Sequence, residues 1–204
     1  MKKVLSLTLA VLTVISMFTI STSALVSVAI TEEEAKTQAA EYVGTTADKL
    51  SNYKCTAVET TLVQVLVISV KAYDYNMTFR ANGTNYTITI DAIGALKNYK
   101  YDGNGIKQPK TGITWASEND ALASALDKAG VLSSDAYVYS RTFEISDYTA
   151  YYKFSFYGKD CDVTVKVYAI GAITNSDNVA KTEKNAFVIF FLKLFAKIKN
   201  AFGL

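Results

Sequence analysis

The side chains that could do chemistry in this 204-residue chain are carboxylates and two thiols, because the sequence contains no histidine. Neighbouring carboxylates can act as general acid and base, and three stand together at Glu32, Glu33 and Glu34. They directly follow Thr31, a residue type that favours the position before a helix. Because acidic side chains in a first helical turn interact favourably with the helix dipole, we interpret the glutamates as a helix start and not as a catalytic cluster.

Two other acidic positions indicate turns. The run Asp102-Gly103-Asn104-Gly105 resembles the start of a calcium loop but lacks the later oxygen ligands. Asp91 ends a strand-like run and is expected to fix the turn that follows. The lack of histidine excludes the usual zinc clusters and every histidine-dependent nucleophile, and no glycine-rich phosphate loop is present. We therefore predict a protein that is not an enzyme and uses no cofactor or metal.

The two thiols, Cys55 and Cys161, leave two alternatives open. An exported protein permits a disulfide between them, and such a bond would tie the first half of the chain to the second. The other alternative is two separate buried thiols, since the geometry of a disulfide cannot be read from sequence. Asp160 and Asp162 flank Cys161 and indicate a solvated hairpin turn.

The elements that must position these residues occur twice. The sequence Ala-Ile-Gly-Ala at 92–95 returns at 169–172, each time after a strand-like run. Upstream, the segment 31–35 matches 117–121, and Gly44 matches Gly130. A duplicated module without catalytic residues favours a binding function.

Each repeat is predicted to open with a helix. Thr31 can cap the first helix, Glu34 can complete a capping box, and Gly44 can end it. In the second repeat, Ser117 is the expected cap and Gly130 the expected end.

Strands are predicted after each helix. The β-forming runs are 61–73, 75–81 and 86–92 in the first repeat, and 136–145, 151–157 and 163–169 in the second. Asn82-Gly83 between two such runs is a strong hairpin signal. The first repeat has about nine extra residues around 55–73, which predicts an added hairpin or a longer strand there.

The expected fold class is α+β, with two repeats that each pack one helix on an antiparallel β-sheet, plus a C-terminal amphipathic helix. Repeat 1 covers 30–101 and repeat 2 covers 113–180. The segment 102–112 is the predicted linker, because it contains three of the ten glycines and the only proline.

The N-terminal segment 1–29 is predicted to be a secretory signal peptide. Lys2 and Lys3 precede an apolar run over 4–20, and small residues follow, so that cleavage after either Ala24 or Ala29 is expected. An uncleaved anchor is the alternative. The short apolar core with two lysines is typical of a bacterial protein.

The C-terminal segment 181–204 is predicted to form a cationic amphipathic helix. At 100° per residue, one face collects the apolar residues Phe187, Phe191, Leu194, Phe195, Ile198 and Phe202. Lys193 and Lys197 lie opposite, and Lys199 lies nearer the apolar edge, where it could snorkel. The longest uncharged stretch, 185–192, is too short to cross a bilayer. Such a helix suits the membrane interface; the alternative is packing on the protein's own body or on a second copy.

Charge is divided between the body and this tail. Residues 30–180 contain 14 Lys or Arg and 18 Asp or Glu, a net charge of −4, whereas 181–204 contain five Lys and one Glu, a net charge of +4. The body contains no basic patch of the kind that would indicate nucleic acid binding. The tail could meet anionic lipid head groups.

The first repeat resembles the PepSY family. The resemblance lies in the opening segment 30–36, in Gly44, in the paired strands, and in Ile90-Asp91-Ala92-Ile93-Gly94. The second repeat diverges, with Tyr168 at the position of the aspartate and Ala116 at the position of Ile30. PepSY modules occur in the propeptides of thermolysin-like secreted metallopeptidases and in exported bacterial proteins. The resemblance implies a non-catalytic module that could restrain a peptidase outside the cell.

These observations predict an exported, non-catalytic binding protein at the outer face of the cell membrane or envelope. Its expected partner is a protein or peptide, a secreted peptidase among them, and its tail would bind the membrane surface. The alternative is a structural envelope protein that self-associates through the C-terminal helix.

Overall fold

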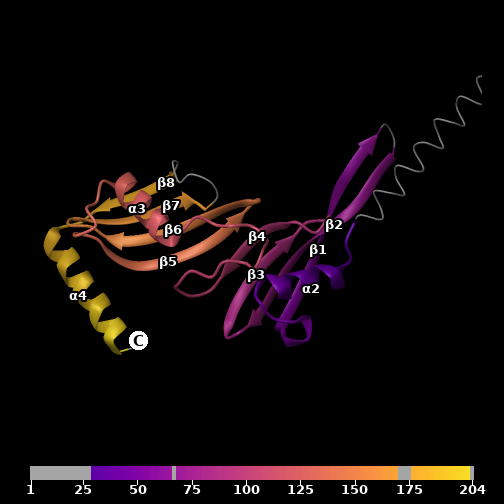
Figure 1. Cartoon of the computed structure of the whole chain (residues 1–204), viewed down its shortest axis with the longest axis horizontal. Helices are drawn as coiled ribbons and strands as arrows, with labels where there is room; N and C mark the ends of the chain where they lie inside the picture. The colour runs from indigo at the N-terminus through magenta and orange to yellow at the C-terminus, as the bar shows by residue number, and fades with distance from the viewer. Residues whose placement is uncertain (1–28, 66–67, 170–175, 203–204) are drawn as a thin grey trace, which may run out of the picture.

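The computed structural model describes residues 29–65, 68–169 and 176–202, so the predicted signal peptide lies outside the described residues. The fold is α+β, as expected, with three α-helices and eight strands among the described residues (Figure 1). The helices are α2 (Glu32–Tyr42), α3 (Glu118–Ala129) and α4 (Ala186–Phe202). The strands are β1 (Ser51–Val65), β2 (Ile68–Ala81), β3 (Thr84–Ile90), β4 (Leu96–Tyr101), β5 (Tyr137–Ser146), β6 (Thr149–Tyr157), β7 (Cys161–Tyr168) and β8 (Ser176–Glu183).

The strands form one antiparallel sheet in the order of the chain, β1 to β8. The sequence predicted a separate sheet for each repeat, and the single continuous sheet corrects that prediction. Strands β4 and β5 join its two parts through the pair Tyr99 and Ile145. The segment after β4 strengthens this join, because the Gly105 N–H donates to the Arg141 carbonyl at 2.8 Å and the Phe143 N–H donates to the Tyr101 hydroxyl at 2.8 Å.

One hydrophobic core runs under both α2 and α3 and follows one face of the sheet. Alanines such as Ala35, Ala39 and Ala125 are fully buried, so the helix backbones approach the sheet closely. A row of aromatic rings crosses the join between β4 and β5. Its centroids are separated by 6.0 Å from Tyr86 to Tyr99, 6.4 Å from Tyr99 to Phe143 and 5.4 Å from Phe143 to Tyr152. Ring contacts of this kind stabilise the join beyond the burial of area.

The predicted helix ends are confirmed. The Glu34 N–H donates to the Thr31 hydroxyl, and the Glu34 carboxylate accepts from the Thr31 N–H at 2.7 Å, which is the expected capping box. The Asp120 N–H donates to the Ser117 hydroxyl at the start of α3. Gly44 and Gly130 follow the two helices with φ angles of +72° and +64°, a conformation that favours glycine.

Two strand predictions need correction. The run 61–73 was expected to be one strand, but it belongs to β1 and β2, which pair as a long hairpin. The reason is that its β-branched residues continue across the reversal without a glycine or proline to mark it. The added hairpin that the extra residues around 55–73 predicted is thereby confirmed. Strands β4 and β8 were not predicted at all, since polar and charged residues interrupt them. The Asn82-Gly83 hairpin is confirmed, with φ angles of +50° and +77°.

Candidate functional site

The acidic residues that could do chemistry have structural roles. Glu34 completes the helix cap, and the Thr31 N–H and hydroxyl lower the pKa of its carboxyl group. Asp102 accepts a hydrogen bond from the Asn85 side chain at 3.0 Å. Over the described residues, no three His, Cys, Asp or Glu side chains gather as a metal site would require. Glu34 and Asp102 thus serve a helix start and a turn, as the sequence predicted. Asp162, which was expected in a solvated turn, lies instead in β7, where it accepts the Tyr139 hydroxyl and pairs with Lys184.

Asp91 fixes the turn after β3, as expected. One oxygen of its carboxylate accepts the N–H groups of Ile93 at 3.1 Å and Ala95 at 2.8 Å. The other oxygen accepts the Tyr148 hydroxyl at 2.8 Å. Sequence analysis missed Tyr148, because it lies 57 residues away in the turn between β5 and β6. Partial burial, together with the Asp91 carboxylate, raises the pKa of Tyr148 to about 12, so the phenol remains a hydrogen-bond donor.

The two cysteines are free thiols. Cys55 is half-buried on β1, and Cys161 is buried on β7. Of the two alternatives left open by the sequence, the structure therefore has separate thiols. Desolvation raises the pKa of Cys55, and a raised pKa disfavours the reactive thiolate.

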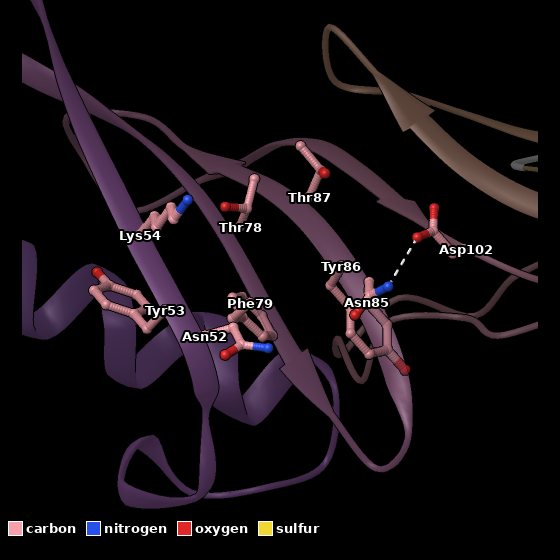
Figure 2. Close-up of a pocket in the computed structure, with 9 residues that line it drawn as sticks. All are labelled: Asn52, Tyr53, Lys54, Thr78, Phe79, Asn85, Tyr86, Thr87 and Asp102. Atoms are coloured by element: carbon pink, nitrogen blue, oxygen red, sulfur yellow. Dashed lines mark hydrogen bonds between the residues drawn. The ribbon is translucent and has the colours of Figure 1, made fainter.

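A pocket of about 480 Å³ lies over the first three strands (Figure 2). On the sheet face away from α2, Lys54, Thr78 and Thr87 occupy neighbouring positions. At the side of the pocket next to the end of β4, the Asn85 side chain donates a hydrogen bond to the Asp102 carboxylate. The lining thus combines one lysine and two threonine hydroxyls on neighbouring strands with the Asn85–Asp102 pair.

Among the described residues, half of the exposed large apolar side chains lie on the C-terminal helix α4. In Figure 1, α4 extends away from the end of the sheet that carries β5 to β7. Its beginning is fixed where Lys184 pairs with Asp162 at 2.8 Å and where the Phe187 N–H donates to the Asn185 side chain. Helix α4 then contacts β6 and β7.

One side of α4 faces the body. Ile189 is buried at 1% exposure, and the Lys193 ammonium donates to the Asp135 carbonyl at 2.6 Å. At 100° per residue these two side chains lie about 40° apart on the helix, whereas Phe187 and Leu194 lie on the other side. The helix therefore docks through its less apolar side.

The apolar side of α4 is exposed to solvent. The exposed fractions run from 39% to 69% for Phe187, Val188, Phe190, Phe191, Leu194, Phe195 and Ile198. Five of these residues were predicted from the sequence. Val188 and Phe190 were missed, although their angular positions place them at the two edges of the same arc. Lys197 is exposed at one edge. Phe202 and Lys199 belong to the helix, but their side chains lie outside the described part. We call these seven exposed residues the Phe face.

Comparison with protein families, with characterised proteins and with solved structures found no match. None of the helices in the described ranges is long and apolar enough to span a membrane.

Proposed function

We propose that this chain is an exported, non-catalytic binding protein that α4 holds at the outer face of the cell membrane or envelope. The observation that carries the proposal is the Phe face, because the helix docks on its own body through the opposite side. The body then presents its sheet to a protein or peptide partner, and a secreted peptidase is the partner class that we infer from the PepSY resemblance.

The energetics of the Phe face favour a membrane interface. Burying a Phe, Leu or Ile side chain is worth about 1.5–3 kcal/mol relative to full exposure. Because the seven side chains are only 39–69% exposed, the gain for the whole face is on the order of 5–10 kcal/mol. Lysines near anionic lipid add roughly 1 kcal/mol each. Lys197 at the edge of the face and Lys199 in the sequence suit that surface. A cationic helix with a Phe-rich face is typical of an interfacial anchor.

We further propose that α2 with β1–β4 and α3 with β5–β8 are two diverged copies of one module. Equivalent backbone bonds support this proposal. The Ile30 N–H donates to the Ala92 carbonyl at 3.0 Å, and the Ala116 N–H donates to the Ala169 carbonyl at 2.9 Å. These are the positions that the repeated sequence motifs place in correspondence.

Two tyrosines extend the correspondence between the copies. The Tyr75 hydroxyl donates to the Ile30 carbonyl at 3.1 Å, and the Tyr152 hydroxyl donates to the Ala116 carbonyl. Each tyrosine precedes its Ala-Ile-Gly-Ala motif by 17 residues in the sequence. In each proposed module, the residue before the helix cap is thus hydrogen-bonded to an equivalent backbone carbonyl and an equivalent tyrosine hydroxyl of the sheet.

Membrane attachment is tested by flotation of the chain with phosphatidylcholine vesicles, with and without phosphatidylglycerol. The wild-type chain is expected to float with the vesicles, and a larger fraction should float when the anionic lipid is present. The double variant Phe191→Asp plus Phe195→Asp is expected to remain in the dense fraction. The matched control is Ile113→Asp plus Leu132→Asp, which adds the same charge at two exposed apolar residues outside α4. Equal flotation of the two double variants would contradict the attachment.

The binding role is tested with the Phe191→Asp plus Phe195→Asp chain, which removes lipid binding from the measurement. We expect this double variant to inhibit substrate cleavage by a thermolysin-like metallopeptidase secreted by the producing organism. The inhibition should increase with the concentration of the variant. Unchanged cleavage by every such peptidase would refute the regulatory part of the proposal.

The second candidate function is a structural envelope protein that self-associates through α4. It is favoured by the same Phe face, since a second copy could cover it. Deletion of 186–204 would then convert an oligomer into a monomer, and the wild-type chain would stay oligomeric without lipid. The deletion leaves the Lys184–Asp162 ion pair in place.

A further inference from the structure

The sheet face opposite the core carries a group of cations on β1 to β4. Exposed residues alternate with buried ones along these strands, so Lys54, Arg80 and Lys100 lie on the side away from α2. Thr78 and Thr87 lie on the same side and are also exposed. We call these five residues the basic face. Lys54 and the two threonines line the pocket described above, and Figure 2 shows them on neighbouring strands.

The register of the strands fixes the spacing of the basic face. Lys54 pairs with Thr78, Thr78 pairs with Thr87, and Thr87 pairs with Lys100, so that these residues form one row across four strands. Because neighbouring strands are about 4.8 Å apart, the Cα atoms at the two ends of the row are about 14 Å apart. Arg80 lies two residues beyond Thr78 on β2, about 7 Å along the strand. The three cations therefore stand on three sides of two hydroxyl groups.

The cations of the basic face have no acidic partner in the described part of the chain, where none of the three forms an ion pair. The carboxylates on the same side of these strands are already engaged. Asp74 pairs with Lys97 at 2.9 Å, and Asp102, which also lines the pocket, accepts from the Asn85 amide at 3.0 Å. The basic face thus offers positive charge to an external anion, although residues 30–180 carry a net charge of −4.

The second half of the sheet differs, because most of its cations on this side are neutralised within the chain. Lys166 on β7 pairs with Glu144 on β5, and Lys184 after β8 pairs with Asp162 at 2.8 Å. Lys153 on β6 remains without such a partner among the described residues, and it lies beside the paired Lys166. Unpaired positive charge is therefore concentrated on β1 to β4, and a local field of this sign attracts anions.

Phosphate is the anion that best matches these donors. Arginine, lysine and threonine side chains are common contacts of phosphate oxygens, and the guanidinium fork of Arg80 suits two such oxygens. A planar carboxylate holds both oxygens in one plane, whereas the oxygens of a tetrahedral phosphate point in different directions. A phosphate above Thr78 and Thr87 can therefore accept from the hydroxyls below it and from cations at its sides at the same time.

We propose that the basic face binds a phosphate-bearing polymer outside the cell. One phosphate is held by Thr78, Thr87 and Arg80, and neighbouring phosphates of the same polymer lie near Lys54 and Lys100. A chain fits better than a single ion, because one phosphate does not fill the distance of about 14 Å between the two lysines. The choice of a polymer over a lipid head group rests on the proposed function, since α4 lies at the opposite end of the molecule from β1 and β2 (Figure 1).

The test is the fluorescence anisotropy of end-labelled inorganic polyphosphate, titrated with the chain that carries Phe191→Asp plus Phe195→Asp so that the Phe face does not contribute. We expect saturable binding that weakens as salt is added, because the site is exposed to solvent. Polyglutamate of equal charge is expected to bind about tenfold more weakly, because its anionic groups are carboxylates. The proposal would be overturned if polyphosphate showed no saturable binding, or if polyglutamate bound equally well.

A pair of lysine variants locates the binding site. Lys54→Ala plus Lys100→Ala is expected to raise the dissociation constant for polyphosphate about tenfold, because two exposed charge contacts are lost. The matched control, Lys49→Ala plus Lys128→Ala, removes the same charge from two exposed lysines on the segment 47–49 and on α3. This control is expected to leave the dissociation constant almost unchanged. Equal dissociation constants for the two double variants would show that net charge alone attracts the polymer and would refute the site.

A threonine variant tests the hydroxyls without a change of charge. Thr78→Val plus Thr87→Val keeps the shape of both exposed side chains and removes both donors, and the dissociation constant for polyphosphate is expected to rise about tenfold. An unchanged dissociation constant would contradict the placement of a phosphate above these two residues.

Flotation with phosphatidylglycerol vesicles separates this inference from the proposed function. The chain with Phe191→Asp plus Phe195→Asp is expected to bind polyphosphate and not to float. If it floats, and if Lys54→Ala plus Lys100→Ala abolishes the flotation, lipid phosphate is the ligand and the choice of a polymer is wrong. The chain with both lysines replaced and an intact Phe face is expected to float as the wild type does. Polymer binding and membrane attachment can therefore fail independently of each other.

Discussion

The carboxylate of Asp91 provides the sharpest test of how the two parts of the sheet are joined. Replacing Asp91 with alanine removes three hydrogen bonds, from the N–H groups of Ile93 and Ala95 and from the Tyr148 hydroxyl. A typical protein hydrogen bond contributes about 1 kcal/mol, so we expect the free energy of unfolding to fall by about 3 kcal/mol. Tyr148→Phe removes one of the three bonds and is expected to cost about 1 kcal/mol.

The coupling between these two residues makes the prediction specific. Once Asp91 is alanine, the Tyr148 hydroxyl has lost this acceptor, so the further change Tyr148→Phe is expected to cost little. The assay is urea unfolding followed by circular dichroism, with the midpoint and slope fitted for each variant. Asp160→Ala is the control, because it removes an exposed carboxylate from another turn. The reasoning would be refuted if the two single variants lost unfolding free energies that added fully in the double variant. It would also be refuted if Asp91→Ala lost no more unfolding free energy than the control.

Two further predictions concern the two ends of the described chain. The pKa of Glu34 is lowered from 4.5 by hydrogen bonds from Thr31, so its contribution to stability is present above about pH 4.5 and is lost as pH falls through the lower folded pKa. Thr31→Ala keeps the backbone N–H, which is the larger cause, and removes the hydroxyl, so an NMR titration should show the Glu34 pKa rising part of the way toward its ordinary value. An unchanged Glu34 pKa would show that the hydroxyl does not contribute. Ile189→Asp places a charge at a buried position and should detach α4, so limited proteolysis should cut the 186–202 segment faster while the melting temperature of the body changes little. Equal cleavage rates would mean that Ile189 does not hold the helix.

Local signals in the sequence predicted local structure well. Thr31 with Glu34 and Gly130 after α3 identified the helix ends, because a cap depends on residues within one turn. The 3.6-residue period of the C-terminal segment also placed Phe187 and Leu194 together on one side of α4. What it could not show was that the opposite side of α4 docks on the body, since the contact from Lys193 to Asp135 spans 58 residues.

Sequence analysis failed where pairing decides the structure. The run 61–73 contains β-branched residues on both sides of its reversal and no glycine or proline between them, so no residue marks the turn. Likewise, β4 becomes a strand because β3 and β5 lie on either side of it, not because Leu96–Tyr101 has a strong preference. The bond between Asp91 and Tyr148 depends on the join between β4 and β5, and no local pattern in the sequence marks that join.

The order of the strands also affects how this chain can fold. Every strand pairs with its neighbour in sequence, so most hairpins can close before the next strand has emerged. The exception is the pair β4 and β5, because residues 102–136 with α3 lie between these strands. Proteins dominated by such local contacts fold faster than sheets with distant pairings. The slower steps should be the bonds that hold each helix start to the sheet, since the Ile30 N–H and the Ala92 carbonyl lie 62 residues apart in the sequence. Helix α4 docks last, because β6 and β7 must already be paired before Ile189 has a surface to bury against.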